Sequence, residues 1–106
     1  MLKNYLSKLI KVRISVLDNI SVINQRVEVI AIFNSTTNNY TPCFPAKMKY
    51  KNQLIEFSEL GFKHPVPRGK KMLHIFEMSD GTNDYRLEFD AESLIWTLIA
   101  ITMGQI

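Results

Sequence analysis

The stretch KKMLHIFEMSDGTNDYRLEFD, residues Lys70–Asp90, decides the fold class of this chain. In its second half, Tyr85, Leu87 and Phe89 alternate with charged residues, which is the two-residue period of a strand with one buried face. In its first half, the odd-numbered and the even-numbered residues are both largely apolar, so both faces of the strand would be apolar. This predicts a more central strand. The polar residues 79–84 between the halves favour a tight turn. The stretch therefore predicts a β-hairpin within a β-rich fold.

Length and composition are those of one folded domain. The chain has 106 residues, with 46% hydrophobic and 22% charged side chains, which argues against a disordered or fibrous chain. We expect one domain, residues 1–106, without an internal boundary. The longest strongly apolar run, residues 94–103, is far shorter than the roughly 20 residues of a membrane-spanning helix. The chain shows no secretory signal pattern, and its single cysteine, Cys43, fits a reducing compartment. We therefore expect a cytoplasmic protein and no membrane partner.

The first eleven residues carry the apolar stripe of an amphipathic helix. Its members are spaced three and four residues apart and are Leu2, Tyr5, Leu6, Leu9 and Ile10. We therefore expect a short N-terminal helix over residues 1–11. Its stripe would cover an open end of the β core, and a dimer contact or a membrane surface are the alternatives.

Further strands follow from β-branched and aromatic runs bounded by turn formers. They are expected at residues 12–17, 27–33, 46–50 and 53–60. The polar residues 34–42 predict a loop, and Lys51-Asn52 predicts a tight turn.

Two segments in the second half need a choice between structures. Residues 61–70 contain two prolines and two glycines and predict a loop, because proline cannot donate the hydrogen bond that a sheet interior requires. Residues 94–103 could form a helix capped by Asp90, but their β-branched residues favour a strand. We expect a core shared by large apolar side chains of this half, namely Phe57, Phe76, Tyr85, Leu87, Phe89 and Trp96.

Aromatic residues recur in a fixed order between residues 27 and 100. The order is Phe44-Pro45-x-Lys47-x-x-Tyr50 with Phe57, then His74-x-Phe76, then Tyr85-Arg86-Leu87-x-Phe89-Asp90, and finally Trp96-x-Leu98. This combination resembles small bacterial all-β domains of unknown function, in which a "pk.f.y.g..y.v" hairpin precedes a "y.l.f...W.L" ending. The resemblance implies a mostly β fold, a small, partly open SH3-like barrel of five or six antiparallel strands. It carries over no catalytic residue.

No group of residues in the sequence has the spacing of a catalytic or metal site. Cys43, His64 and His74 are far apart in sequence and match no metal-ligand motif. We expect His74 to pack inside the fold and His64 to be solvated. The acidic turn at residues 80–84 lacks the length and the terminal glutamate of a calcium loop. We expect neither an enzyme nor a cofactor.

The candidate binding residues are basic and aromatic. They are Phe44, Lys47, Lys49, Tyr50, Lys51, Phe62, Lys63, Arg68, Lys70 and Lys71. Residues 1–51 hold eight basic and two acidic side chains, whereas residues 52–106 hold five and eight, so the two halves differ in charge. We expect a protein-interaction module that uses loops and strand edges, with a protein partner. The alternative is binding of single-stranded nucleic acid through a basic and aromatic face, and a homodimer is also open.

Overall fold

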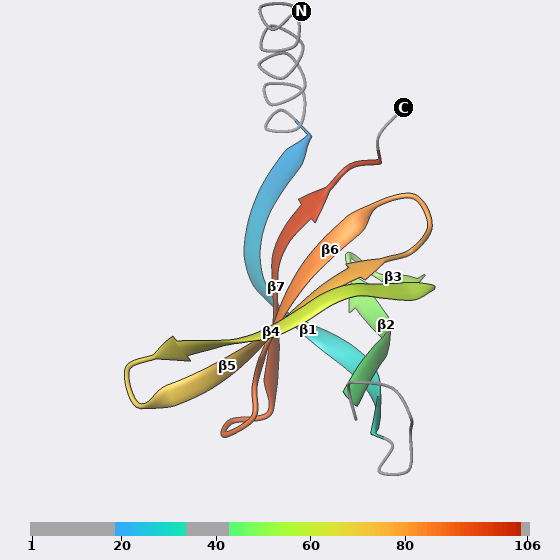
Figure 1. Cartoon of the computed structure of the whole chain (residues 1–106). Coiled ribbons are helices and arrows are strands. Elements are labelled where there is room, and N and C mark those ends of the chain that lie inside the picture. Colours follow the sequence, from blue (N-terminus) through green and yellow to red (C-terminus); the bar gives the residue numbers. More distant parts are fainter. Residues whose placement is uncertain (1–18, 34–42, 105–106) are drawn as a thin grey trace, which may run out of the picture.

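The computed structural model describes residues 19–33 and 43–104 (Figure 1). These residues form seven strands, which are β1 Ile20–Phe33, β2 Cys43–Tyr50, β3 Gln53–Glu56, β4 Glu59–Arg68, β5 Lys71–Ser79, β6 Asp84–Asp90 and β7 Ile95–Thr102. No helix occurs in this part of the chain. The mostly β prediction is confirmed, but there are seven strands and not five or six. The expected N-terminal helix, the strand at 12–17 and the loop at 34–42 lie outside the described residues.

All seven strands belong to one antiparallel sheet in the order β3-β2-β1-β7-β6-β5-β4. The two outer strands, β3 and β4, follow each other in the chain and are separated only by Phe57 and Ser58. The Phe57 amide donates to the Ala46 carbonyl at 2.9 Å, and the Ser58 amide donates to the Ser79 carbonyl at 2.8 Å. These two residues therefore pass from one edge of the sheet to the other. The sheet is strongly curled but not closed.

The predicted β5–β6 hairpin is confirmed, and in its register Phe76 is opposite Leu87 and Met78 is opposite Tyr85. Its turn is held by the Asp80 carboxylate. Oδ1 accepts from the amides of Thr82 and Asn83 at 2.8 and 2.7 Å, and Oδ2 accepts from the Tyr85 hydroxyl at 2.8 Å. Burial raises the pKa of Asp80, but these hydrogen bonds outweigh it and lower the pKa below 3.8. The acidic turn therefore has a structural role.

The β2–β3 hairpin confirms the second predicted turn. Lys51 and Asn52 have φ of 51° and 62°, the left-handed conformation of both central residues in a two-residue hairpin. The expected strand at 53–60 is interrupted after Glu56, where the chain leaves β3 for β4.

The loop predicted at residues 61–70 is wrong, because most of it belongs to β4. This strand pairs only with β5 and forms an edge of the sheet. Pro65 and Pro67 are two residues apart, so both lack their N–H on the same, unpaired side of the strand. Proline is excluded from a sheet interior but is tolerated on such an edge. Only Gly69, with φ of 62°, and Lys70 form the turn into β5.

The strand expected at residues 94–103 is confirmed as β7, which lies between β1 and β6. The alternative, a helix capped by Asp90, is wrong, and the Asp90 carboxylate instead holds a turn. Its Oδ1 accepts from the amides of Glu92 and Ser93 at 2.9 and 3.3 Å. The capped segment is the β6–β7 turn, in which Leu94 has φ of 62°.

The core lies on one side of the curled sheet, which we call the core face. Its buried members come from β2 and from β5 to β7, with one residue between β3 and β4, and are Cys43, Met48, Phe57, Phe76, Met78, Tyr85, Leu87, Phe89, Trp96 and Leu98. The Trp96 ring stacks on the Phe89 ring, with 4.5 Å between the ring centroids, and it packs against the Phe76 ring, with 5.3 Å between the centroids. All six predicted core residues are present, so that prediction is confirmed.

Candidate binding groove

Strand β5 is covered on both sides. Phe76 and Met78 point to the core face, whereas Leu73 and Ile75 point to the opposite side and are still only 4% and 7% exposed. On that side their cross-strand neighbours on β4 are Val66 and His64. We call this side of β4 to β7 and of the first half of β1 the groove face.

The groove face is hollowed along β6 and β7. Three hollows have volumes of ≈ 260, ≈ 360 and ≈ 370 Å³. The first two share Arg68, Glu88 and Thr97, and the last two share Arg86 and Ile99, so they form one continuous groove. It follows the eight residues of β7, about 26 Å at about 3.3 Å per residue. Figure 1 shows β1 on one side of these strands and the β4–β5 hairpin on the other.

Irregularities in two neighbouring strands lie at the middle of the groove. The β1–β7 register shifts between Val22 and Gln25, and Asn24 within this step has φ of 52°. The β6–β7 register shifts between Arg86 and Leu87, so Ile99 has no partner on β6. Bulges of this kind bend a strand and increase its twist, which gives a physical reason for the concave surface.

One wall of the groove carries three ion pairs. Arg68 contacts Glu88 at 3.2 Å, Lys71 contacts Asp90 at 3.4 Å, and Arg86 contacts Glu77 at 2.9 Å. The side chains of Glu88 and Asp90 are only 13% and 17% exposed, so loss of their partners would leave poorly solvated charges.

Ion-pair and turn contacts also shift the pKa of two groups in this wall, Asp90 and Arg86. Burial raises the pKa of Asp90, but hydrogen bonds from Glu92, Ser93 and Lys71 outweigh it and lower the pKa below 3.8. Hydrogen bonding to Glu77 raises the pKa of Arg86. Both shifts favour the charged form, so Asp90 and Arg86 are ionised at neutral pH.

The opposite wall, formed by β7 and β1, is largely apolar. Ile95 and Ile99 line it from β7, and Val22, which is 70% exposed, lines it from β1. Arg26 lies at the β1 side and makes no ion pair among the described residues. The groove thus has a charged wall, an apolar wall and a cation, Arg26, that makes no ion pair among the described residues.

The ten predicted binding residues do not form one cluster. Arg68 and Lys71 line the groove, and Phe62 is exposed beside it with its ring 4.9 Å from that of His64. Lys70 lies in the β4–β5 turn, and Lys63 is opposite Phe76 in the pairing of β4 with β5.

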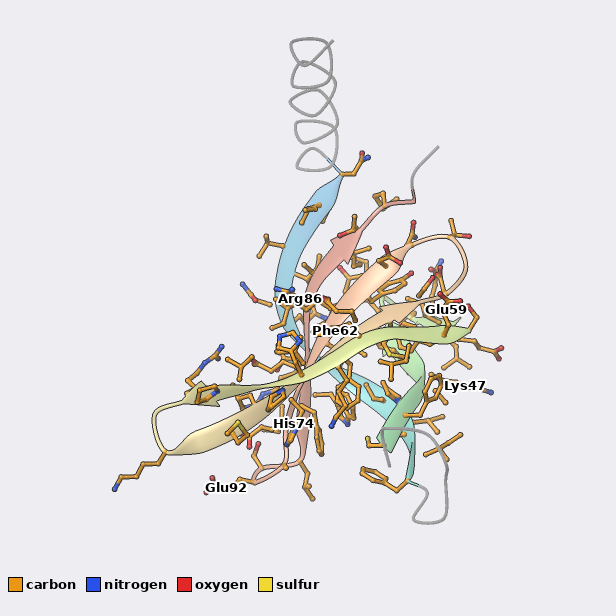
Figure 2. All side chains as sticks on the ribbon, in the orientation of Figure 1. Lys47, Glu59, Phe62, His74, Arg86 and Glu92 are labelled. Atoms are coloured by element: carbon orange, nitrogen blue, oxygen red, sulfur yellow. The ribbon has the colours of Figure 1, made fainter. Side chains whose placement is uncertain are left out.

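The other five predicted residues are on or next to β2, which the strand order separates from the β4–β5 hairpin by β1, β7 and β6. The curl of the sheet nevertheless brings Lys63 of β4 near Cys43 of β2. Figure 2 shows Lys47 well apart from Phe62. Phe44 and Tyr50 are half-buried and pack against the core, Lys47 and Lys49 are on β2, and Lys51 lies 5.5 Å from the Tyr50 ring.

Sequence reasoning missed Arg26, Thr97 and Ile99 as groove residues. The available signal was that residues on both faces of β5 are apolar. Such a strand must pack against other side chains on both of its faces. The expectation that His64 is solvated is wrong, since it is half-buried with its Nδ1 shielded and without a hydrogen-bond partner among the described residues. His74 is also half-buried, opposite Phe89.

Comparison with protein families, curated proteins and solved structures found no match. Residues 19–33 and 43–104 contain no cluster of three or more histidine, cysteine or acidic side chains suited to a metal ion. Burial raises the pKa of Cys43, with a smaller opposing effect of the Lys63 charge, so its thiol stays protonated at neutral pH. Within the described part of the chain no helix is long and apolar enough to cross a bilayer.

Proposed function

We propose that this chain is a protein-interaction module and that its groove takes an extended segment of a partner protein. The observation that supports this most directly is the continuous groove, about 26 Å long, along β6 and β7. An extended peptide of about eight residues has the same length. A surface with an apolar wall and several fixed charges suits a peptide, because apolar contacts supply affinity and polar groups fix orientation.

The composition of the walls indicates the chemistry of the partner segment. Arg26 would pair with an acidic side chain of the partner, since Glu88 and Asp90, the carboxylates of the same hollow, are already paired with Arg68 and Lys71. Aliphatic side chains of the partner would pack on Ile95 and Ile99. The preferred ligand is therefore an extended segment that combines aliphatic and acidic residues.

Both free edges of the sheet are poor sites for addition of a strand. Strand β3 has only four residues, and β4 lacks two amide donors on its free side at Pro65 and Pro67. Strand addition depends on main-chain hydrogen bonds, and proline on an edge strand prevents them. This favours the groove over the strand edges as the place where a partner segment binds.

The charge pattern supports a protein partner over nucleic acid. Lys47, Arg68 and Lys71 are each within 3.4 Å of a carboxylate, which reduces their attraction for phosphates. Phe44 and Tyr50, the aromatic residues nearest Lys47 and Lys49 in sequence, pack against the core, which limits base stacking.

The test is selection of peptides from a random display library with the full chain, followed by titration of the enriched peptides. We expect enrichment of aliphatic and acidic residues, and at least about tenfold weaker binding to an Arg26→Glu variant. Lys49→Glu is the matched control. Lys49 is a strand cation on β2 outside the groove that makes no ion pair among the described residues, and its reversal should leave peptide affinity within about twofold.

Labelled single-stranded oligonucleotides, titrated at low and moderate salt, form the second arm of the experiment. Salt-dependent oligonucleotide binding without any enriched peptide would overturn the proposal in favour of nucleic-acid recognition. Enriched peptides that bind Arg26→Glu as tightly as the unchanged chain would exclude the groove.

A further inference from the structure

Three aliphatic side chains face water at the end of the sheet away from the groove. Ile30 and Ile32 on β1 are 59% and 55% exposed, and Leu54 on β3 is 58% exposed. The pairing of β1 with β2 and of β2 with β3 places all three on the side of the sheet opposite Met48 and the core. We call these three residues the aliphatic patch. A hollow of ≈ 240 Å³ beside it is lined by Ile30, Leu54, Lys47 and Lys49.

The charges around the patch are balanced and interleaved. Lys47 contacts Glu56 at 3.4 Å, and Lys49 is directly opposite Glu28 on β1. This face therefore carries two cations and two anions with no net charge. A partner of a single charge sign, such as nucleic acid or an anionic membrane, would gain no net attraction from it.

A surface with both charge signs around an apolar centre is complementary to a copy of itself. In a two-fold symmetric contact, each cation of one copy can face an anion of the other, because every contact occurs twice with the roles exchanged. Homodimer interfaces are also more apolar than other surfaces, as is the centre of this one.

We propose that the outer side of the second half of β1, β2 and β3 is the interface of a symmetric homodimer. The aliphatic patches of two copies pack against each other as two facing sheets. Strand β3 is a four-residue edge of the sheet, so among the described residues no further strand lies beyond it in the path of the second copy. The patch shares no residue with the groove, so the dimer does not depend on the peptide-binding proposal and leaves both grooves open.

The test is sedimentation velocity of the full chain over a range of concentrations. We expect a concentration-dependent dimer that Ile30→Asp weakens at least tenfold. Val22→Asp is the matched control, because Val22 is on the same strand, is 70% exposed and lies in the groove. It should leave the dimer unchanged. Circular dichroism of both variants checks that they fold.

A charge-swap pair tests the symmetric arrangement. Lys49→Glu alone should weaken the dimer severalfold, and adding Glu28→Lys in the same chain should restore it, because the swapped charges again face their opposites. A chain that stays monomeric at every concentration would overturn the proposal. A dimer that resists Ile30→Asp, or that is weakened equally by Val22→Asp, would show that another surface is used.

Discussion

The two faces of the β5–β6 hairpin are built from alternate residues of the same strands, but they are closed in different ways. Phe76, Leu87 and Phe89 on the core face are buried with Met48 of β2 in one apolar cluster. On the groove face, Leu73 and Ile75 line hollows of the groove, together with ion pairs such as Arg68–Glu88. One hairpin thus serves both packing and recognition. Changes on the core face should mainly alter folding, and changes on the groove face should mainly alter binding.

Phe76→Ala is expected to have the largest effect on stability. The Phe76 side chain is 1% exposed, and its ring centroid lies 5.3 Å from that of Trp96. Loss of the ring leaves a cavity in the core and should lower the free energy of unfolding by about 3–5 kcal/mol. Urea unfolding followed by circular dichroism measures the change. Thr97→Ala, on the groove face of β7, is the comparison variant. A loss below about 1 kcal/mol for Phe76→Ala would contradict the assignment of the core.

Ile75→Ala tests the groove face of the same strand. Its side chain is 7% exposed but borders a hollow, so less packing is lost and we expect a decrease of about 2 kcal/mol, clearly smaller than for Phe76→Ala. Peptide affinity should fall as well. If the two variants lost equal stability, the groove face would be a second core and not a binding surface.

Asp80→Asn tests the turn that joins the two strands. The carboxylate accepts three hydrogen bonds, and weakening them should lower the free energy of unfolding by about 1 kcal/mol at neutral pH. The pKa of Asp80 is lowered in the folded state. Its contribution is therefore complete above the unfolded-state pKa of about 3.9 and is lost as the pH falls through the lower folded-state value. Urea unfolding at several pH values should show that the difference in the free energy of unfolding between Asp80→Asn and the unchanged chain becomes smaller in acid. A difference that stays constant with pH would refute this role.

The Glu77–Arg86 ion pair should have the smallest effect. Both side chains are partly exposed, at 31% and 51%, so a double-mutant cycle with alanine should give a coupling energy below about 1 kcal/mol. Added salt should reduce it further. A coupling of about 2 kcal/mol or more, unaffected by salt, would indicate that this part of the groove face behaves as a buried network.

The sequence predicts those parts of the fold that local patterns determine. The β5–β6 and β2–β3 hairpins follow from alternation and turn residues, and β7 follows from its β-branched content. Strand β4 could not be recognised, because Pro65 and Pro67 fit a strand only at an edge of the sheet. Edge position depends on the order of all seven strands, and no local pattern encodes it.

The groove was predictable only in part for a similar reason. Arg68 and Lys71 were identified as basic residues, but their ion pairs with Glu88 and Asp90 depend on the meeting of β4, β5 and β6. The irregular register around Asn24 and Ile99 depends on the pairing of β1, β7 and β6. A single strand read alone shows neither the pairs nor the bend.

Mapping of amide chemical shifts by NMR, on titration of the full chain with a selected peptide, is the most direct test of the groove as the binding site. We expect the largest changes along Ile95–Thr102 and at Asn24 and Arg26, with core-face residues such as Leu87 little affected. Changes concentrated at Lys47 to Lys51, or along the free edge of β4, would contradict it.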